Sequence, residues 1–137
     1  MLPNNILPDE ELTDLCINHW KVLQKKQGFR FSIDAVLLAH FIQPATKQRL
    51  LDLGTGSAVI PLLVAARHPD VPIDGIELQP AIAAMAQRSV QYNQLQQQIR
   101  IIQYDLTKLP KQYEQQYDWV TSNPPFFPVG TGKQNPN

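Results

Sequence analysis

Short apolar runs alternate with longer amphipathic segments from residue 49 to residue 122. The apolar runs have the length of strands, and the segments between them carry helix boundary signals such as Pro80 at a start and Asn93 at an end. Strands separated by helices are typical of a parallel sheet with helices on its faces. The predicted strands are 49–53, 71–78, 100–105 and 117–122, and the predicted helices are 58–67, 79–93 and a short one within 106–116, which contains Pro110.

The N-terminal part of the chain follows a different pattern. Acidic residues crowd the first turn of one segment, which predicts a short helix. Two β-prone runs then flank a basic turn with Gly28 and predict a hairpin. A second helix is expected to begin at Ser32, as its N-cap, and to end at Pro44. These elements are expected at 9–17 for the first helix, 20–24 and 29–32 for the hairpin strands, and 32–44 for the second helix.

The predicted sheet is unfinished at one side. In a doubly wound sheet the first and fourth strands are interior, and further strands lie outside the fourth. Here the sequence stops soon after the fourth strand, which would leave an apolar edge prone to association. We therefore expect an α/β fold with a partial Rossmann-like core, 46–137, preceded by an N-terminal region, 1–45. Such a chain would be a fragment of a longer polypeptide, or would self-associate through the uncovered strand.

Composition narrows the classes of function. The 137 residues suit one domain, and 43% hydrophobic content favours a packed core over disorder. Zero net charge argues against a strongly electrostatic nucleic-acid binder, but not against an enzyme that contacts RNA through a local patch. The single Cys16 excludes an intrachain disulfide, and the histidines lack metal-ligand spacing. With no secretory signal and no membrane span in the pattern, we expect a cytoplasmic protein without metal.

A glycine-containing loop, Asp52-Leu53-Gly54-Thr55-Gly56-Ser57, joins the first core strand to a helix. Its glycines allow a tight turn and close approach of a ligand, and the helix N-terminus offers free N–H groups to an anionic group. This context indicates a nucleotide-type site, although a simple turn would look similar. A dinucleotide dehydrogenase would need a small residue at 59, where this chain has Val59. The loop therefore favours S-adenosyl-L-methionine.

Two acidic residues end the next strands. Glu77 lies about twenty residues beyond the glycines, where an acid can accept hydrogen bonds from both ribose hydroxyls. Asp105 could accept a hydrogen bond from the adenine amine, and Leu78 or Leu106 could pack on the ring. Because ligands bind beyond the carboxyl ends of parallel strands, the positions agree with one cofactor site. A solvated acid and a turn-forming aspartate are the simpler readings.

The segment Asn123-Pro124-Pro125-Phe126 ends the fourth strand. The prolines hold the backbone extended and leave carbonyl groups as acceptors, and the Asn123 side chain adds another. Two acceptors on one exocyclic NH2 favour a localised lone pair on a nitrogen that is otherwise a poor nucleophile. Catalysis would then be orientation and stabilisation of charge on nitrogen, with Phe126 stacked on a flat substrate. A proline-rich strand exit without function is the alternative.

Basic and aromatic residues interleave in the predicted hairpin. They could contact RNA phosphates and bases, or they could form a solvated face, and the sequence does not separate the two. They are Lys21, Lys25, Lys26 and Arg30 among Trp20, Phe29 and Phe31.

The loop at 52–57 together with Glu77, Asp105 and the Asn-Pro-Pro-Phe segment resembles the class I methyltransferases that carry an Asn-Pro-Pro-aromatic signature. The stretch from Lys21 to Ala39 resembles the tRNA (adenine-N6)-methyltransferase branch of that group. The resemblance implies transfer of a methyl group to adenine N6 of tRNA. It implies that the cofactor is bound by Asp52, Gly54, Thr55, Gly56, Glu77, Leu78, Asp105 and Leu106, with Ser32 and Asp34 approaching it, and that Asn123, Pro124, Pro125 and Phe126 hold the target base.

The sequence departs from that family in its missing later strands and RNA-facing elements, and in two places within the motifs. Ala58 stands where the loop often has a third glycine, and Phe126 stands where the signature often has tyrosine, so stacking remains but a hydroxyl is lost. Two alternatives stay open. One is a glutamine methyltransferase acting on a protein release factor, which shares the signature. The other is a non-catalytic module that binds the cofactor or RNA without turnover.

Overall fold

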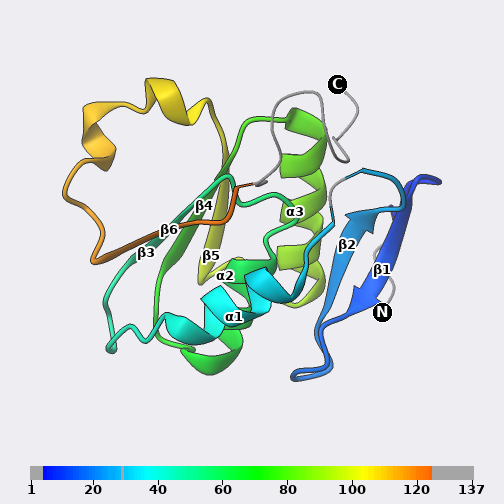
Figure 1. Cartoon of the computed structure of the whole chain (residues 1–137), viewed down its shortest axis with the longest axis horizontal. Coiled ribbons are helices and arrows are strands. Elements are labelled where there is room, and N and C mark those ends of the chain that lie inside the picture. Colours follow the sequence, from blue (N-terminus) through cyan, green and yellow to red (C-terminus); the bar gives the residue numbers. More distant parts are fainter. Residues whose placement is uncertain (1–4, 29, 125–137) are drawn as a thin grey trace.

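The computed structural model describes residues 5–28 and 30–124, which form a hairpin, three helices and a parallel sheet (Figure 1). Pro125 and Phe126, to which the sequence assigns catalytic roles, lie outside these residues. The described elements, in chain order, are β1 (Glu10–Asp14), β2 (Lys21–Lys25), α1 (Ile33–Phe41), β3 (Leu50–Leu53), α2 (Val59–Arg67), β4 (Ile73–Glu77), α3 (Pro80–Tyr92), β5 (Ile99–Gln103), the 3-10 turns η1 (Leu106–Lys108) and η2 (Lys111–Tyr113), and β6 (Trp119–Ser122).

The four core strands form one parallel sheet in the order β5-β4-β3-β6, which confirms the predicted α/β class. Leu50 is paired with Ile73 on one side and with Trp119 on the other. Apolar side chains of these strands form one buried cluster with residues of α1, α2 and α3. In Figure 1 the η1–η2 segment (yellow to orange) lies on the other side of the strands from α3.

β6 is an edge strand of the described sheet, as the sequence predicts. Its one described partner is β3, and Val120 is 58% exposed. An edge of this kind presents unpaired backbone groups that can pair with another strand. The expected self-association through this edge stays a prediction, and so does the division of the chain at residues 45 and 46.

The prediction for the N-terminal part is wrong in two respects. Residues 10–14, expected in a helix, form β1, which pairs antiparallel with β2. The described residues 30–32, expected as the second hairpin strand, are not in a strand. Strand pairing and burial of Glu10, which is 2% exposed, override the local preference of an acidic segment for a helix. The loop between the strands contains three left-handed residues, Cys16, Asn18 and His19. None of them is glycine, so the sequence does not indicate this turn.

The hairpin is attached to α3 through the free edge of β2 (Figure 1). Leu23 N donates to Ser89 Oγ at 2.9 Å, and Lys21 N donates to Asn93 Oδ1 at 3.0 Å. Asn93 Nδ2 donates in turn to Lys21 O at 2.7 Å. The side chains of Ser89 on α3 and of Asn93, its C-cap, thus satisfy the backbone groups that β1 leaves unpaired, as another strand would.

Two smaller predictions also need correction. Ser32 occupies the N-cap position of α1, but its side chain makes no capping hydrogen bond, and α1 ends at Phe41 rather than near Pro44. The crossover between β5 and β6 contains η1 and η2 instead of an α-helix. Pro110 lies between these turns as the N-cap of η2, and it interrupts any longer helix because it has no N–H to donate.

Candidate functional site

The loop after β3 adopts a conformation that glycine makes possible. Gly54 and Gly56 have φ of +66° and +58°. Between them, Thr55 N donates to Ile76 O at 2.9 Å, which holds the loop against the end of β4. A Cβ at Gly75 would lie 2.9 Å from the Thr55 side chain, so the glycine on β4 makes room for Thr55. The loop is therefore fixed on the sheet by its middle residue, with a left-handed glycine on each side.

Ala58 extends this pattern to the start of α2. It has φ of +70° and occupies the N-cap position of that helix. A left-handed conformation costs a residue with a Cβ roughly 1–2 kcal/mol. Ala58, which the sequence has in place of the expected glycine, is thus at a strained backbone position.

Asp52, on β3, is 1% exposed and lies beneath this loop. Thr121 Oγ1, on β6, donates to Asp52 Oδ1 at 3.0 Å. Burial raises the pKa of Asp52 to about 6, a rise that the neighbouring hydroxyls of Thr55 and Thr121 partly oppose. The Thr55 hydroxyl is itself buried and makes no hydrogen bond of good geometry within the described part of the chain. Asp52 is thus a buried carboxylate that takes part in no ion pair among the described residues.

Glu77 ends β4 and connects the loop to α3. Its Oε1 accepts from Gly56 N at 3.1 Å, and its Oε2 accepts from Gln79 N at 2.8 Å. Each carboxylate oxygen has two lone pairs, so both oxygens retain acceptor capacity for ligand hydroxyls. The two backbone bonds hold the carboxylate in one orientation at the tip of β4.

Asp105 follows β5 and caps η1. Its Oδ1 accepts from Thr107 N at 2.9 Å and from Thr107 Oγ1 at 2.7 Å. These bonds hold the pKa of Asp105 below its usual value, so the group is a carboxylate at neutral pH. Leu78 and Leu106 are 56% and 45% exposed beside these acids. They are available to pack on a flat ring.

The remaining predicted site residues have fewer described contacts. Asn123 follows β6 and is half-buried, and Pro124 is exposed. Ser32 and Asp34 are exposed at the start of α1, and no hydrogen bond between described residues joins either side chain to the Gly54–Gly56 loop. The structure therefore brings Asp52, the loop and Glu77 into contact, and the approach of Ser32 and Asp34 to the cofactor stays a prediction.

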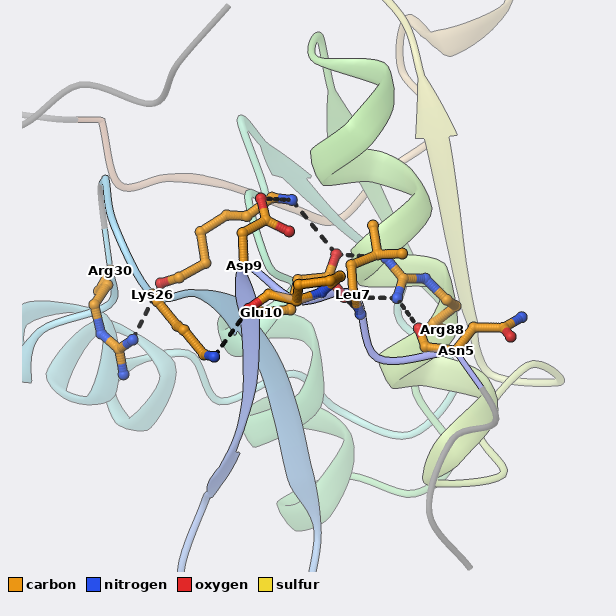
Figure 2. A network of polar contacts seen from close by, with 9 residues as sticks. Asn5, Leu7, Asp9, Glu10, Lys26, Arg30 and Arg88 are labelled. Carbon is orange, nitrogen blue, oxygen red and sulfur yellow. Dashed lines mark hydrogen bonds and ion pairs between the residues drawn. The ribbon is translucent and has the colours of Figure 1, made fainter.

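Three of the basic residues, Lys25, Lys26 and Arg30, make polar contacts within the protein, and Figure 2 labels the last two. Lys25 Nζ lies 2.8 Å from Asp9 Oδ2, Lys26 Nζ donates to Pro8 O at 2.9 Å, and Arg30 pairs with Glu11. Such pairing favours a structural role over RNA contact, two readings that the sequence left balanced. Arg88 of α3 forms a two-pronged pair with Glu10, with both N–O distances at 2.7 Å. Nothing in the local sequence indicates that pair, because its members are far apart in the chain.

Thr121 is the site residue that sequence reasoning missed. It alternates with exposed neighbours along β6, so the strand period could have placed its side chain on the buried face with Trp119. Among the described residues, no group of three or more His, Cys, Asp or Glu side chains could hold a metal ion. None of the helices described is long and apolar enough to cross a membrane.

The chain is similar in sequence to proteins of known function. A tRNA1(Val) (adenine(37)-N6)-methyltransferase of Yersinia pestis (strain Pestoides F) is 36% identical over 107 residues, which are 77% of this chain and 43% of that protein. The chain thus spans less than half the length of the curated relatives it matches.

Solved structures show the same fold. The human methyltransferase 10 domain containing protein aligns with 26% identity and a TM-score of 0.57, over 68% of this chain and 48% of that one. The delta-N METTL16 MTase domain aligns with 24% identity and a TM-score of 0.63, over 77% of this chain and 51% of that one. The family model of the methyltransferase small domain matches residues 16–135. The chain therefore belongs to the methyltransferase small domain family.

Proposed function

We propose that the protein carrying this chain transfers a methyl group from S-adenosyl-L-methionine to adenine N6 in tRNA, in the cytoplasm. One observation carries the proposal: the Gly54–Gly56 loop, Glu77, Asp105 and Asn123 all follow the carboxyl ends of strands in one parallel sheet, β3, β4, β5 and β6. Ligands of such sheets bind at this edge. The names of the relatives supply the substrate, tRNA, and the nitrogen that is modified.

The residues fit such a cofactor in charge and in shape. Glu77 presents an oriented carboxylate to the ribose hydroxyls, and Asp105 presents one to the adenine amine. Leu78 and Leu106 offer exposed apolar surface to the adenine ring. The loop allows close approach of the methionine portion, since open space surrounds Gly54 and Gly56, where an added Cβ would meet nothing within 4 Å. Their left-handed backbone would also strain any residue with a side chain.

When bound, the cofactor supplies an electrophilic methyl group on a sulfonium centre. The protein's part is to hold the amine in line with that methyl group. Asn123 Oδ1 and the Pro124 carbonyl accept hydrogen bonds from the NH2 protons, which favours a localised nitrogen lone pair and stabilises the positive charge that develops on nitrogen. Phe126 stacks on the base in this proposal, which for that residue and for Pro125 depends on the sequence alone.

The polypeptide encoded by the gene, incubated with labelled cofactor and total tRNA, should yield labelled N6-methyladenosine after digestion to nucleosides. In a parallel incubation with a release factor, label in a glutamine of that protein instead would support the alternative methyltransferase. Cofactor binding without transfer to either would support the non-catalytic module.

Asn123→Ala should lower the rate of methyl transfer by about 100-fold, because it removes one of two acceptors that act in the transition state. The dissociation constant for S-adenosylhomocysteine, measured by calorimetry, should stay within about threefold, which is below 1 kcal/mol. Ser122→Ala is the matched control, since the exposed Ser122 points to the other face of β6. Equal losses of transfer and cofactor affinity would contradict the role of Asn123.

A further inference from the structure

β3 and β6 share a buried polar contact between side chains directly below the site. Asp52 and Thr121 are register partners, 1% and 7% exposed, and are joined by the 3.0 Å hydrogen bond from the Thr121 hydroxyl. We propose that this bond fixes the distance between the cofactor loop and the amine-binding Asn123, which makes Thr121 a positioning residue for methyl transfer. The inference deepens the proposed function and rests on it.

The contact is equally far from both reacting ends. Asp52 lies two residues before Gly54, and Thr121 lies two residues before Asn123. Two residues of extended chain span about 7 Å, so a shift of the backbone at the contact also moves Gly54 and Asn123. Pro124 disfavours the helical conformation for Asn123, so the extended path of β6 continues through it. Its side chain then lies on the same side of the strand as that of Thr121.

Backbone pairing alone does not hold the two tips. The ladder between β3 and β6 ends at the pair Leu53 and Ser122, one residue beyond the contact. Beyond it, both chains leave the sheet, the first into the left-handed Gly54 and the second into Pro124. The side-chain bond therefore adds a second connection between β3 and β6 one residue before their pairing stops.

A hydroxyl is required at this place, and apolar packing would not replace it. The Asp52 carboxylate has no ion pair among the described residues, and the Thr121 hydroxyl is the donor that reaches it across the strands. Valine has the shape of threonine but no donor, so Thr121→Val keeps the packing and removes the bond. Serine keeps the donor with one methyl group less.

The first test separates positioning from binding. Thr121→Val should lower kcat for methyl transfer by about 10- to 100-fold, as expected when reacting groups are displaced by a fraction of an ångström to 1 Å. KM for tRNA and the dissociation constant for S-adenosylhomocysteine should change by less than about threefold. Thr121→Ser should restore most of kcat. The control, Thr13→Val, removes the hydroxyl that Gln24 contacts in the hairpin and should leave kcat unchanged.

The second test needs no methyl transfer. Addition of S-adenosylhomocysteine to the isotopically labelled protein should shift the backbone amide signals of Gly54, Gly56 and Asn123. In Thr121→Val, the shifts at the glycines should persist while the shift at Asn123 is lost, and Thr121→Ser should regain it.

The outcomes distinguish the two proposals. Suppose that the protein carrying this chain methylates tRNA. If the kcat of Thr121→Val then stays within about twofold, or if kcat and cofactor affinity fall in parallel, the positioning role is wrong and the proposed function stands. If the protein carrying this chain methylates no tRNA, the proposed function is wrong. In that case the amide shifts alone decide whether the two strands are coupled.

Discussion

The junction between the hairpin and α3 and the tips of the parallel strands both bury a carboxylate, but with opposite partners. Glu10, at the junction, accepts from two nitrogens of Arg88 and from Leu7 N (Figure 2). Lys25 Nζ lies 3.5 Å from Glu10 Oε1. Burial alone would raise the pKa of Glu10, but these partners outweigh it and the pKa lies below its usual value. Among the described residues, Asp52 has hydroxyl neighbours and no ion pair, and burial raises its pKa to about 6.

The difference indicates two uses of buried polar groups. At the junction every partner stabilises the folded chain. The strand tips contain three unfavourable features: Asp52 is buried with no ion pair among the described residues, the Thr55 hydroxyl has no hydrogen bond of good geometry there, and Ala58 is left-handed. Such features persist where the surrounding structure enforces them, and they concentrate at functional sites. The comparison therefore assigns stability to the junction and function to the tips.

The largest expected effect is at the junction. Arg88→Met should lower the free energy of unfolding by about 3 kcal/mol at neutral pH, because it leaves the Glu10 carboxylate buried without its main partner. Urea unfolding followed by circular dichroism measures this. Arg30→Met is the control, because the Arg30 and Glu11 side chains are 33% and 44% exposed, and its effect should stay below about 1 kcal/mol. Similar effects of the two variants would remove the distinction made for the junction.

A smaller effect of opposite sign is expected at the tips. Asp52→Asn should raise the free energy of unfolding by about 2 kcal/mol above pH 7, since one pKa unit corresponds to about 1.4 kcal/mol and the lost carboxylate interactions offset part of the gain. The same variant should lower methyl transfer.

The sign of this effect depends on pH. The folded-state pKa of Asp52, about 6, lies above its ordinary value of 3.8, so ionisation of Asp52 costs the folded state free energy above pH 6. That cost disappears as the pH falls through 6 towards 4, so the two proteins should converge in stability there. A gain from Asp52→Asn that is independent of pH would show that ionisation is not its cause.

The smallest expected effect concerns backbone strain. Ala58→Gly should raise the free energy of unfolding by about 0.5 kcal/mol, because relief of the left-handed conformation exceeds the loss of one buried methyl group, worth about 0.8 kcal/mol. Thermal and urea unfolding measure it. Ala83→Gly makes the same deletion at a buried position inside α3 and should destabilise by about 1 kcal/mol or more. Loss of stability in both variants would exclude strain at Ala58.

The sequence predicted the core well because its signals are local. The apolar runs around Leu50, Ile73, Ile99 and Trp119 are strands, and glycines stand where the loop after β3 turns left-handed. The same locality explains the failures. The acidic segment at 10–14 has helical signals of its own, and its β conformation depends on pairing with β2. Glu10 and Arg88 are 78 residues apart, so no local periodicity or motif of the sequence indicates that they pair.

The amino-acid sequence by itself determined the alternation of strands and helices and the placement of glycines, acids and Asn123 at strand ends, because these depend on neighbours within a few residues. Tertiary structure alone decided which carboxylates acquire cations and which do not. A charge is raised or lowered in free energy by whatever lies within a few ångströms of it, and for Glu10 and Asp52 those partners come from distant segments. That is why two buried acids have pKa values shifted in opposite directions.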